Sequence, residues 1–381
     1  MTRELRVVPA GPEVLEALRA ALAGGPAILV RPSGAPPAEA GRSPELPREV
    51  PQKVALVVET SGSTGRPKRV AISADALLAN AAAGQAALAA GSPGAWVLAL
   101  PTHYIAGLNV LARSIAAGID PAVVAPGPFT ASAFVRAAAR VAEPHPLVSL
   151  VPAQLATLLG DEPARAALSG FGAVLVGGQA TPAALLDAAR EAGIHVVRSY
   201  GSSETSGGCV YDGEPIGTTR MRVVDGEVQL GGPGIAEGYL GDPALSGERF
   251  LEEDGVRWFR TADAGSVDAD GRLRVTGRRD DVIVSGGLKV ALGDIERVAR
   301  EEPRLVDAVA VAVPHPRWGE RAVLVTAAPE DAELGGRLDA RLAAELGPAA
   351  RPLRIVWGTG IPTLASGKPD RLALHRLALD G

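Results

Sequence analysis

The sequence predicts an α/β protein with a large N-terminal domain, a small β-rich subdomain and a small mobile α+β C-terminal domain. Helix-like segments alternate with short apolar runs in the first half of the chain, a pattern typical of largely parallel β-sheets covered by helices. Short strand-like stretches with Asp-Gly and Gly-Gly turns follow between residues 221 and 275. A charged joint then precedes a mixed segment of strands and helices.

The elements of the N-terminal domain follow from the spacing of apolar residues. Four segments with helical spacing are predicted to be helices: residues 12–23, 74–90, 131–142 and 182–192. Four apolar runs are predicted to be buried strands: residues 27–30, 95–100, 148–151 and 173–176. The proline-rich stretch 32–51 is predicted to be irregular.

The last part of the chain predicts a second compact unit. After Gly277 we expect a strand, a helix that starts near Leu292, strands over residues 307–313 and 321–327, and a helix over residues 335–346. The expected division is an N-terminal domain over residues 1–276, a hinge over 277–281 and a C-terminal domain over 282–381.

The composition fits a globular enzyme and excludes some other classes. Hydrophobic residues make up 47% of the 381 residues and charged residues 21%, so the chain can bury large cores. The 38 Lys and Arg against 43 Asp and Glu give a net charge of −5, which argues against nucleic-acid partners. The single cysteine, Cys209, excludes an internal disulfide and is expected to be a small buried thiol.

The stretch between Asp75 and Arg113 contains no charged residue, yet it does not predict a membrane span. Polar and helix-breaking residues interrupt it: Asn80, Gly84, Gln85, Gly91, Ser92, Pro93 and Gly94. A buried helix and strand fit better. Acidic residues, Glu4 and Glu13 among them, also break the pattern of a signal peptide, so we expect a cytoplasmic protein.

Residues 60–68, Thr-Ser-Gly-Ser-Thr-Gly-Arg-Pro-Lys, follow an apolar stretch and predict a phosphate-binding loop. Glycines allow the backbone to turn with positive φ, so N–H groups, hydroxyls and the Lys68 ammonium can converge on phosphate oxygens. The run is not a Walker A loop, because Pro67 precedes the lysine and Arg69 follows it. The alternative is a flexible surface turn.

Two carboxylates stand in segments that suit a nucleotide. In Tyr-Gly-Ser-Ser-Glu-Thr, residues 200–205, a purine could stack on Tyr200, and Glu204 could bind Mg²⁺, which takes one or two carboxylates plus phosphate oxygens. The alternative for Glu204 is an acid at a helix N-terminus. Asp263 could accept hydrogen bonds from both hydroxyls of a ribose. The alternative is that Asp263 is an ordinary turn or cap residue.

Two further segments suggest motion and charge stabilisation. Residues 277–290 hold a charged joint, a short strand, a Gly-Gly turn and Lys289, which fits either a hinge with a mobile functional loop or an ordinary β-hairpin. Lys368 stands in a Gly-Lys-Pro turn, where it could stabilise charge on a transferring phosphoryl group, although most lysines in turns are merely solvated.

In this order, the segments resemble the adenylate-forming superfamily of acyl-CoA synthetases, peptide-synthetase adenylation domains and luciferases, from about Lys53 to the C-terminus. The resemblance implies two steps. An acid reacts with MgATP to give an acyl-adenylate and pyrophosphate, and the acyl group then passes to CoA. The C-terminal domain would rotate about the hinge between the steps.

The resemblance implies a role for each matching residue. Catalytic roles fall on Lys368, Glu204 and Lys68. The phosphate loop comprises Thr60, Ser61, Gly62, Ser63, Thr64, Gly65 and Lys68, with Thr64 and Glu204 at the metal. The adenine site comprises Gly178, Gln179, Ala180, Ser199, Tyr200, Gly201 and Ser203. The ribose would bind Asp263 and Arg278, and the hinge pivot would be Asp280. The acyl pocket comprises His103, Gly107, Ser206, Gly207 and Gly208, and the CoA loop Gly286, Gly287 and Lys289.

Residues 203–213 resemble the short actinobacterial o-succinylbenzoate–CoA ligases of menaquinone biosynthesis. That acid is an aromatic keto-diacid, so its pocket needs an apolar slot, which the small residues 206–208 could leave, and a cation for the second carboxylate. The sequence does not rank the candidate cations Arg113, Arg198 and Lys289. Tyr104 occupies the usual histidine position of the family, so His103 is given no catalytic role.

The resemblance implies ATP, Mg²⁺ and CoA as cosubstrates and no tightly bound prosthetic group. The partners would be small molecules, and a homodimer stays open. Two rival functions remain at this point: a CoA ligase for another aryl or fatty acid, and a catalytically silent nucleotide-binding homologue.

Overall fold

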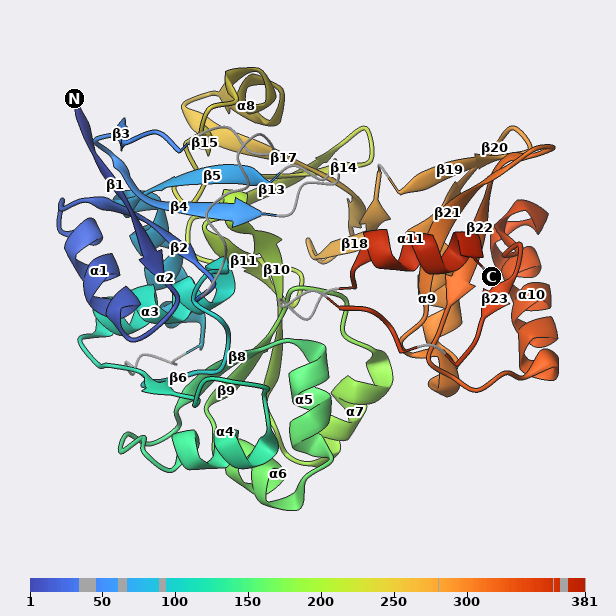
Figure 1. The fold of residues 1–381 in the computed structure, drawn as a ribbon, viewed down its shortest axis with the longest axis horizontal. Helices are drawn as coiled ribbons and strands as arrows, with labels where there is room; N and C mark the ends of the chain where they lie inside the picture. Colours follow the sequence, from blue (N-terminus) through green and yellow to red (C-terminus); the bar gives the residue numbers. More distant parts are fainter. Residues whose placement is uncertain are drawn as a thin grey trace. The chain divides into compact units, whose positions relative to one another are not determined.

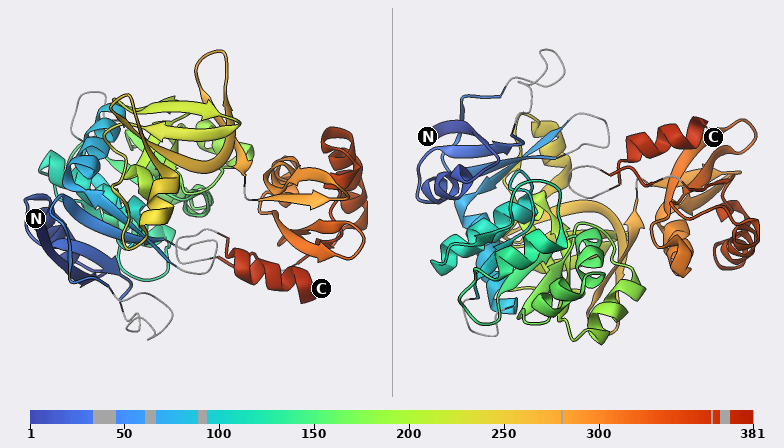
Figure 2. Two further views of the ribbon diagram at one scale, coloured as in Figure 1. Left: turned by 90° about the horizontal axis from the view of Figure 1, so that it is seen from above. Right: turned by 60° about the horizontal axis from the view of Figure 1, so that its bottom comes forward.

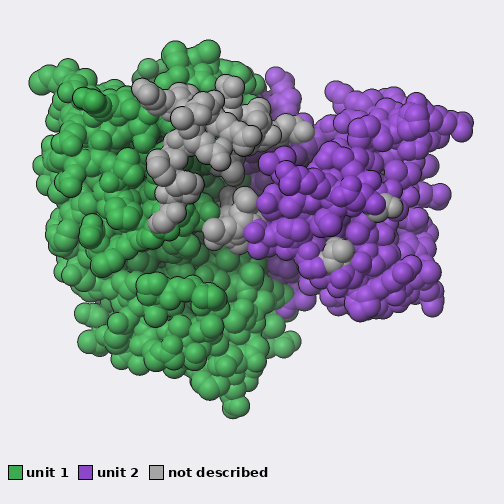
Figure 3. Space-filling view, viewed as in Figure 1, with its two compact units in different colours: residues 1–181, 185–222, 229–261 green, residues 182–184, 223–228, 262–381 purple. Residues whose placement is uncertain are grey.

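The computed structural model describes residues 1–33, 46–60, 67–88, 94–279, 281–358, 360–363 and 369–380 (Figure 1). The chain forms two compact units (Figure 3). Unit 1 comprises residues 1–181, 185–222 and 229–261, and unit 2 comprises residues 182–184, 223–228 and 262–381. The chain leaves unit 1 for the last time at residue 261, within β17 (Val256–Val267). The hinge over residues 277–281 stays a prediction.

The first sheet of unit 1 is mixed, with the strand order β15-β5-β4-β2-β1-β3. Its strands are β1 (Thr2–Pro9), β2 (Ala27–Arg31), β3 (Glu49–Pro51), β4 (Val54–Thr60), β5 (Lys68–Ser73) and β15 (Gly238–Tyr239). β1, β2 and β4 run parallel, whereas β5 returns antiparallel to β4. A parallel return would need a crossover helix, and the connection from β4 to β5 is too short for one. β3 forms at the end of the stretch predicted to be irregular.

The second sheet of unit 1 has the order β12-β11-β10-β9-β8-β6-β7. Its strands are β6 (Trp96–Leu98), β7 (Ala122–Val123), β8 (Leu147–Leu150), β9 (Ala173–Val176), β10 (Val196–Ser202), β11 (Gly207–Tyr211) and β12 (Glu214–Pro215). β6 to β10 are parallel, and β8 and β9 are buried along their whole length. These apolar runs were predicted as buried parallel strands, and that prediction is confirmed.

Helices cover both faces of the second sheet. The helices of this region are α1 (Glu13–Leu22), α2 (Ala74–Leu88), α3 (Ile105–Ala117), α4 (Ala131–Ala138), α5 (Pro152–Leu159), α6 (Glu162–Leu168) and α7 (Ala183–Glu191). α2 and α3 pack on each other, and α2 also packs on β5 and β11, so they lie between the two sheets (Figure 1). Val148 of β8 and Val174 of β9 lie on the other face of the second sheet, where they pack with α4 to α7. α3, α5 and α6 were not predicted as separate helices.

A third sheet follows the order β13-β14-β17-β16, with β18 paired to β17. Its strands other than β17 are β13 (Arg220–Val224), β14 (Glu227–Gly231), β16 (Phe250–Glu253) and β18 (Leu273–Arg278). The β-rich character predicted for residues 221–275 is confirmed. A short helix, α8 (Pro243–Arg249), was missed there.

The C-terminal part of unit 2 is a sheet with the order β20-β19-β22-β21, and β23 pairs with β22. Its elements are β19 (Val282–Ser285), β20 (Leu288–Ala291), α9 (Leu292–Arg300), β21 (Val309–His315), β22 (Gly319–Val325), α10 (Ala332–Leu346), β23 (Ile355–Val356) and α11 (Arg371–Asp380). The orange-to-red helices flank this sheet (Figure 2).

The two faces of this sheet have separate cores because successive side chains of a strand point to opposite faces. Ala310 and Leu324 pack with α9 and α10, whereas Val311 and Val325 pack with Leu374 of α11. The predicted α+β unit is confirmed, and α11 was not predicted.

Candidate active site

Glu204 lies at the centre of the candidate site in unit 1. It belongs to a 3₁₀ turn, Ser203–Thr205, directly after β10. The Tyr239 hydroxyl donates to Glu204 Oε1 at 2.9 Å, and the Lys68 ammonium lies 5.5 Å from the centre of the Tyr239 ring. Strand pairing produces this arrangement, because Tyr239 lies opposite Val70, two residues after Lys68 at the start of β5. The predicted metal carboxylate and the phosphate-loop lysine therefore meet around one tyrosine.

Tyr239 was not among the residues predicted for the site. Its ring is buried and packs against the Phe250 ring, with 5.4 Å between the ring centres. No local pattern marks it, because its position depends on the pairing of β15 with β5, whose residues are far apart in the chain.

The predicted phosphate loop joins β4 to β5, and Thr60 and Lys68 lie opposite each other at its base. Glu59, the residue before Thr60, pairs with Arg31 at 2.8 Å and with Arg69 at 3.1 Å. Burial alone would raise the pKa of the Glu59 carboxyl, but hydrogen bonds from the two guanidinium groups lower it below its ordinary value. A charged network thus anchors the base of the loop.

The loop itself stays a prediction. Its central residues lie outside the described ranges: Ser61, Gly62, Ser63, Thr64 and Gly65. The contacts of these residues with phosphate, and the role of Thr64 as a metal ligand, therefore also stay predictions.

The predicted adenine-binding residues gather at the carboxyl ends of β9 and β10. These strands are parallel neighbours, and a Cβ at Gly177 would lie 3.1 Å from the Ser199 carbonyl oxygen. Gly178, Gln179 and Ala180 are exposed, Ser199 and Tyr200 are half-buried, Gly201 is exposed and Ser203 is buried. Nucleotides commonly bind at the carboxyl ends of parallel strands, so the structure brings these residues together where a base could bind.

We expected the glycines after Glu204 to leave an open slot, but the space where a Cβ would lie at these positions is already filled. A Cβ at Gly207 would collide with Nδ2 of Asn109, and a Cβ at Gly208 would collide with Oγ of Ser199. Both positions require glycine because neighbouring side chains already fill that space. The role of Ser206, Gly207 and Gly208 in the acyl pocket stays a prediction.

His103 lies two residues before α3, and Gly107 lies in the first turn of that helix. Gly107 is glycine because a Cβ would collide with the Pro101 carbonyl oxygen. Both ring nitrogens of His103 are buried without a hydrogen-bond partner among the described residues, and its ring lies 4.1 Å from that of Tyr104. Burial lowers the pKa of His103, so a neutral imidazole is favoured.

Arg113 on α3 is a buried cation. Its side chain is 2% exposed, Nη2 donates to the Tyr211 hydroxyl at 2.8 Å, and the guanidinium lies 4.9 Å from the centre of the Trp96 ring. No carboxylate in the described parts of the chain pairs with Arg113, and its Nε has no partner there. Gly84 leaves it room, since a Cβ would lie 2.8 Å from Nη2.

The other two candidate cations differ from Arg113. Arg198 is exposed and pairs with Asp212 at 2.8 Å. Lys289 is exposed on β20 of unit 2. Of these three candidates, Arg113 is the buried one, and no carboxylate partner for it is found among the described residues.

Unit 2 contains the predicted ribose-binding pair. Asp263 on β17 lies opposite Arg278 on β18, with Nε of Arg278 3.8 Å from Oδ1 of Asp263. The preceding residue, Ala262, has a φ of 62°. Its N–H donates to Glu227 Oε1 at 3.2 Å, and its carbonyl accepts from the Arg279 N–H at 2.8 Å. These bonds hold a strained backbone that sets the direction of Asp263.

The segment that contains the predicted CoA loop forms a β-hairpin, which is also the structure expected from the alternative interpretation of residues 277–290. Gly286 and Gly287 form its turn with φ values of 60° and 83°. A Cβ at Gly286 would lie 2.6 Å from the Trp318 ring, which adds a second reason for glycine. Contacts of this turn and Lys289 with CoA stay predictions.

Lys368 and Asp280 lie outside the described residues, so the adenylation lysine and the hinge pivot stay predictions. The residues that flank the Lys368 segment are described. Thr363 and Pro369 form an antiparallel bridge, and the Asp370 N–H donates to the Pro362 carbonyl at 2.8 Å.

A metal site built from protein ligands alone is not found in the described ranges, where no three His, Cys, Asp or Glu residues are arranged to hold an ion. Glu204 fits a different arrangement. Mg²⁺ often arrives with nucleotide phosphates and needs only one or two protein carboxylates. Glu204 has a hard oxygen donor and forms no ion pair with any described residue.

Comparison with known families adds the deciding observation. Residues 11–240 match the model of AMP-binding enzymes, and residues 294–368 match that of the AMP-binding enzyme C-terminal domain. The chain belongs to the AMP-binding enzyme family. The expected adenylate-forming superfamily is confirmed.

Several relatives of this AMP-binding enzyme are named as CoA ligases. It is 40% identical over 338 residues to the probable 2-succinylbenzoate–CoA ligase of Mycobacterium tuberculosis (strain H37Rv), a match that covers 86% of this chain and 85% of the relative. It is 32% identical over 283 residues to the 2-succinylbenzoate–CoA ligase of Salmonella typhimurium, covering 72% of this chain and 58% of the relative.

Solved structures share the fold of this AMP-binding enzyme. The MenE o-succinylbenzoate coenzyme A synthetase of Bacillus subtilis, in complex with ATP and magnesium ion, matches with a TM-score of 0.77 and 22% identity over 98% of this chain and 89% of that one. NpsA of Klebsiella oxytoca matches with a TM-score of 0.82 and 20% identity over 99% of this chain and 89% of that one. The predicted fold class is confirmed. Within the described ranges, no helix has the length and apolarity needed to span a bilayer.

Proposed function

We propose that this enzyme is an acid–thiol ligase that converts o-succinylbenzoate, ATP and CoA into o-succinylbenzoyl-CoA, AMP and pyrophosphate. A mycobacterial relative that is named as a probable 2-succinylbenzoate–CoA ligase is 40% identical to this chain, and the match covers most of both proteins. The observation that carries the substrate assignment is Arg113, a buried cation that no described carboxylate neutralises.

A buried guanidinium without a carboxylate partner destabilises a fold, so its presence calls for a reason. A substrate that keeps one free carboxylate after the other is activated supplies the missing charge. The charge of Arg113 acts over several ångströms in a poorly solvated interior, so a carboxylate in the pocket benefits without touching the guanidinium. Arg113 lies one helical turn after Asn109, which contacts Gly207 in the predicted acyl pocket.

In the first step, a carboxylate oxygen of the acid attacks the α-phosphorus of ATP, and the bond to pyrophosphate breaks. Lys68 would hold phosphate oxygens, and Glu204, fixed by Tyr239, would hold Mg²⁺. The ion supplies positive charge that offsets the charge building up on the phosphates. Asp263 and Arg278 would orient the ribose, and Lys368 would stabilise the transferring group.

In the second step, the CoA thiolate attacks the acyl carbonyl carbon, and AMP leaves with its phosphate oxygen. Rotation of the C-terminal domain about Asp280 would exchange Lys368 for the Gly286–Gly287 turn and Lys289. Positioning and charge stabilisation account for the rate enhancement in both steps.

The test is product identity. The purified protein is incubated with ATP, Mg²⁺, CoA and one acid from a panel: o-succinylbenzoate, its ester at the carboxylate that is not activated, benzoate and a fatty acid. We expect mass spectrometry to detect a CoA ester with o-succinylbenzoate. A CoA ester formed from another acid but not from o-succinylbenzoate would overturn the substrate assignment. Absence of acid-dependent exchange of pyrophosphate into ATP would overturn the enzymatic function.

Arg113→Met tests the charge assignment. We expect kcat/KM for o-succinylbenzoate to fall about 100-fold, because the second carboxylate loses a buried cation. The activity with a monocarboxylic acid, where measurable, should change little. Arg198→Met is the matched control, since this arginine is exposed and already paired with Asp212. Equal losses of kcat/KM in the two variants would show that Arg113 has no special role in binding the second carboxylate.

A further inference from the structure

Two buried asparagines hold the segment that follows Glu204. Asn80 on α2 is 4% exposed and Asn109 on α3 is 3% exposed. Nδ2 of Asn109 donates to Oδ1 of Asn80 at 2.9 Å and to the Ser206 carbonyl at 2.6 Å. Nδ2 of Asn80 donates to the carbonyls of Thr205 at 3.2 Å and Gly208 at 2.9 Å. Two helices thus supply donors to three carbonyls within four residues.

The backbone of this segment needs such support. Ser206 is 0% exposed and has a φ of 55°, a left-handed conformation that L side chains rarely adopt. Strained residues of this kind persist where the surrounding structure over-determines them. Gly207 has a φ of 113°, and the Asn109 amide occupies the space beside its Cα.

The segment links two parts of the site. Glu204, the candidate metal carboxylate, immediately precedes the held carbonyls, and the predicted acyl pocket includes Ser206, Gly207 and Gly208. The Glu204 carbonyl is also fixed, because it accepts from the Ala236 N–H at 2.8 Å. The Ser206 N–H donates to the Ser203 carbonyl at 3.1 Å and so closes the turn that contains Glu204, which means that a change of backbone at Ser206 would alter the backbone that carries the Glu204 side chain.

We propose that Asn80 and Asn109 are positioning residues that orient Glu204 toward a magnesium–nucleotide complex and couple this site to the acyl pocket. This inference rests on the proposed MgATP-dependent reaction. The asparagines act through the 205–208 backbone and do not touch the metal. Loss of either donor leaves a buried carbonyl unsatisfied, and the turn then relaxes toward a less strained conformation.

The test uses isosteric variants, Asn109→Asp and Asn80→Asp. A carboxylate cannot donate to a carbonyl, so each variant removes the donors without changing side-chain volume. Asn109→Ser and Asn80→Ser are second variants that avoid a buried charge if the aspartates prevent folding. Gln154→Glu is the matched control, because Gln154 also donates to a backbone carbonyl, that of Ala99 at 2.9 Å, on another helix of unit 1.

The readout is ATP affinity by calorimetry in Mg²⁺ and in EDTA, without acid or CoA. We expect the variants to weaken ATP binding about tenfold in Mg²⁺, as is typical when a residue that orients a metal ligand is lost, and to leave binding in EDTA unchanged. Gln154→Glu should change neither. Thermal unfolding of each variant separates this effect from lost stability.

Variants that unfold at lower temperature but keep the wild-type gain in affinity from Mg²⁺ would show a merely structural role and overturn the inference. This assay contains no acid, so a failure of o-succinylbenzoate as substrate leaves its result valid. A wild-type protein without any Mg²⁺-dependent gain in ATP affinity would overturn both this inference and the proposed reaction.

Discussion

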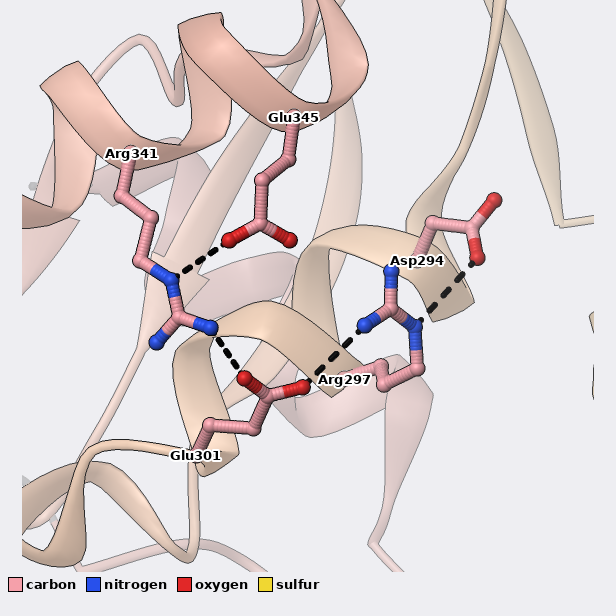
Figure 4. Close-up of polar contacts among 5 residues, drawn as sticks. All are labelled: Asp294, Arg297, Glu301, Arg341 and Glu345. Atoms are coloured by element: carbon pink, nitrogen blue, oxygen red, sulfur yellow. Dashed lines mark hydrogen bonds and ion pairs between the residues drawn. The ribbon is translucent and has the colours of Figure 1, made fainter.

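The helices beside the candidate site in unit 1 and the C-terminal sheet of unit 2 differ in the side chains that pack around them. Helices α2 and α3 of unit 1 bury Asn80, Asn109 and Arg113, and polar atoms of Asn109, Arg113 and Ser206 have no partner among the described residues. The sheet of unit 2 has aliphatic cores on both faces. Charged side chains join α9 and α10 at the surface of this unit, where Arg297 and Arg341 both bind Glu301 (Figure 4).

Buried polar groups destabilise a fold unless they are satisfied, and ligands can satisfy them. Unit 1 therefore gives up stability in the region that carries the candidate site. The two sheet faces of unit 2 pack mainly through aliphatic side chains, although Glu296 and Thr326 are buried there as well. Substitutions in the core of unit 2 should change stability, and substitutions around Glu204 should change activity.

The largest effect is expected for Leu324→Ala in unit 2. Leu324 is 0% exposed, and its loss leaves a cavity beneath α9 and α10. Such truncations destabilise by about 2–5 kcal/mol. Urea unfolding checks this, with Leu353→Ala as control, since Leu353 is 39% exposed. A loss of less than about 1 kcal/mol would mean that the core is loosely packed and that the contrast fails.

Glu204→Gln in unit 1 should lower activity and leave stability nearly unchanged. The amide can still accept from the Tyr239 hydroxyl, so thermal unfolding should change little. Acid-dependent pyrophosphate exchange should fall up to about 100-fold, about 2.7 kcal/mol, because the charged metal ligand is lost. Glu191→Gln, an exposed site at the end of α7, is the control. Retained exchange would remove Glu204 from the metal site.

A smaller effect is expected from pH. Burial lowers the pKa of His103 from its ordinary value of 6.5. Above pH 6.5 the imidazole is neutral in both states; as the pH falls below that value, the unfolded state binds the proton first, so the free energy of unfolding decreases until the pH passes the folded-state pKa. Urea unfolding at pH 7.5 and 5.5 measures this loss.

His103→Gln should reduce the pH dependence of stability, and His195→Gln, at an exposed position, should not. The same loss in wild type and His103→Gln would mean that other groups dominate.

The smallest effect is expected for Arg341→Ala on the surface of unit 2. Arg341 binds Glu345 at 2.6 Å and also binds Glu301, yet its side chain is 40% exposed. Exposed pairs contribute about 0.2–1 kcal/mol, and salt screens them. Urea unfolding at low and high salt checks this, and a larger, salt-independent loss would show that the network supports packing between the helices.

Residues with a local signature could be predicted. Thr60 and Lys68 are paired at the ends of β4 and β5, as expected for a glycine-rich turn between two strands, and such a turn leaves a pattern in a short stretch of sequence. The resemblance to a family named Asp263 and Arg278 together, and these residues lie opposite each other on β17 and β18. The buried strands of the parallel sheet were predictable for a similar reason, since their apolar runs are continuous.

Residues whose role depends on packing could not be predicted. Tyr239 meets Glu204 only through the pairing of β15 with β5, and Asn80 meets the 205–208 segment only because α2 packs on β11. One signal was present. Uncharged polar residues interrupt the apolar stretch after Asp75, and we interpreted them only as breaks in a membrane span, although Asn80 and Gly84 serve buried polar contacts.

Thr363 and Pro369, which flank the segment that contains Lys368, pair with each other through their backbones. β23 pairs with β22 on one side of this stretch, and Leu374 of α11 packs on the same sheet on the other side. The described residues on both sides of the segment that contains Lys368 are therefore anchored to the sheet of unit 2. Under the proposed mechanism, a rotation of unit 2 would move this segment as well, because both of its neighbours belong to that unit.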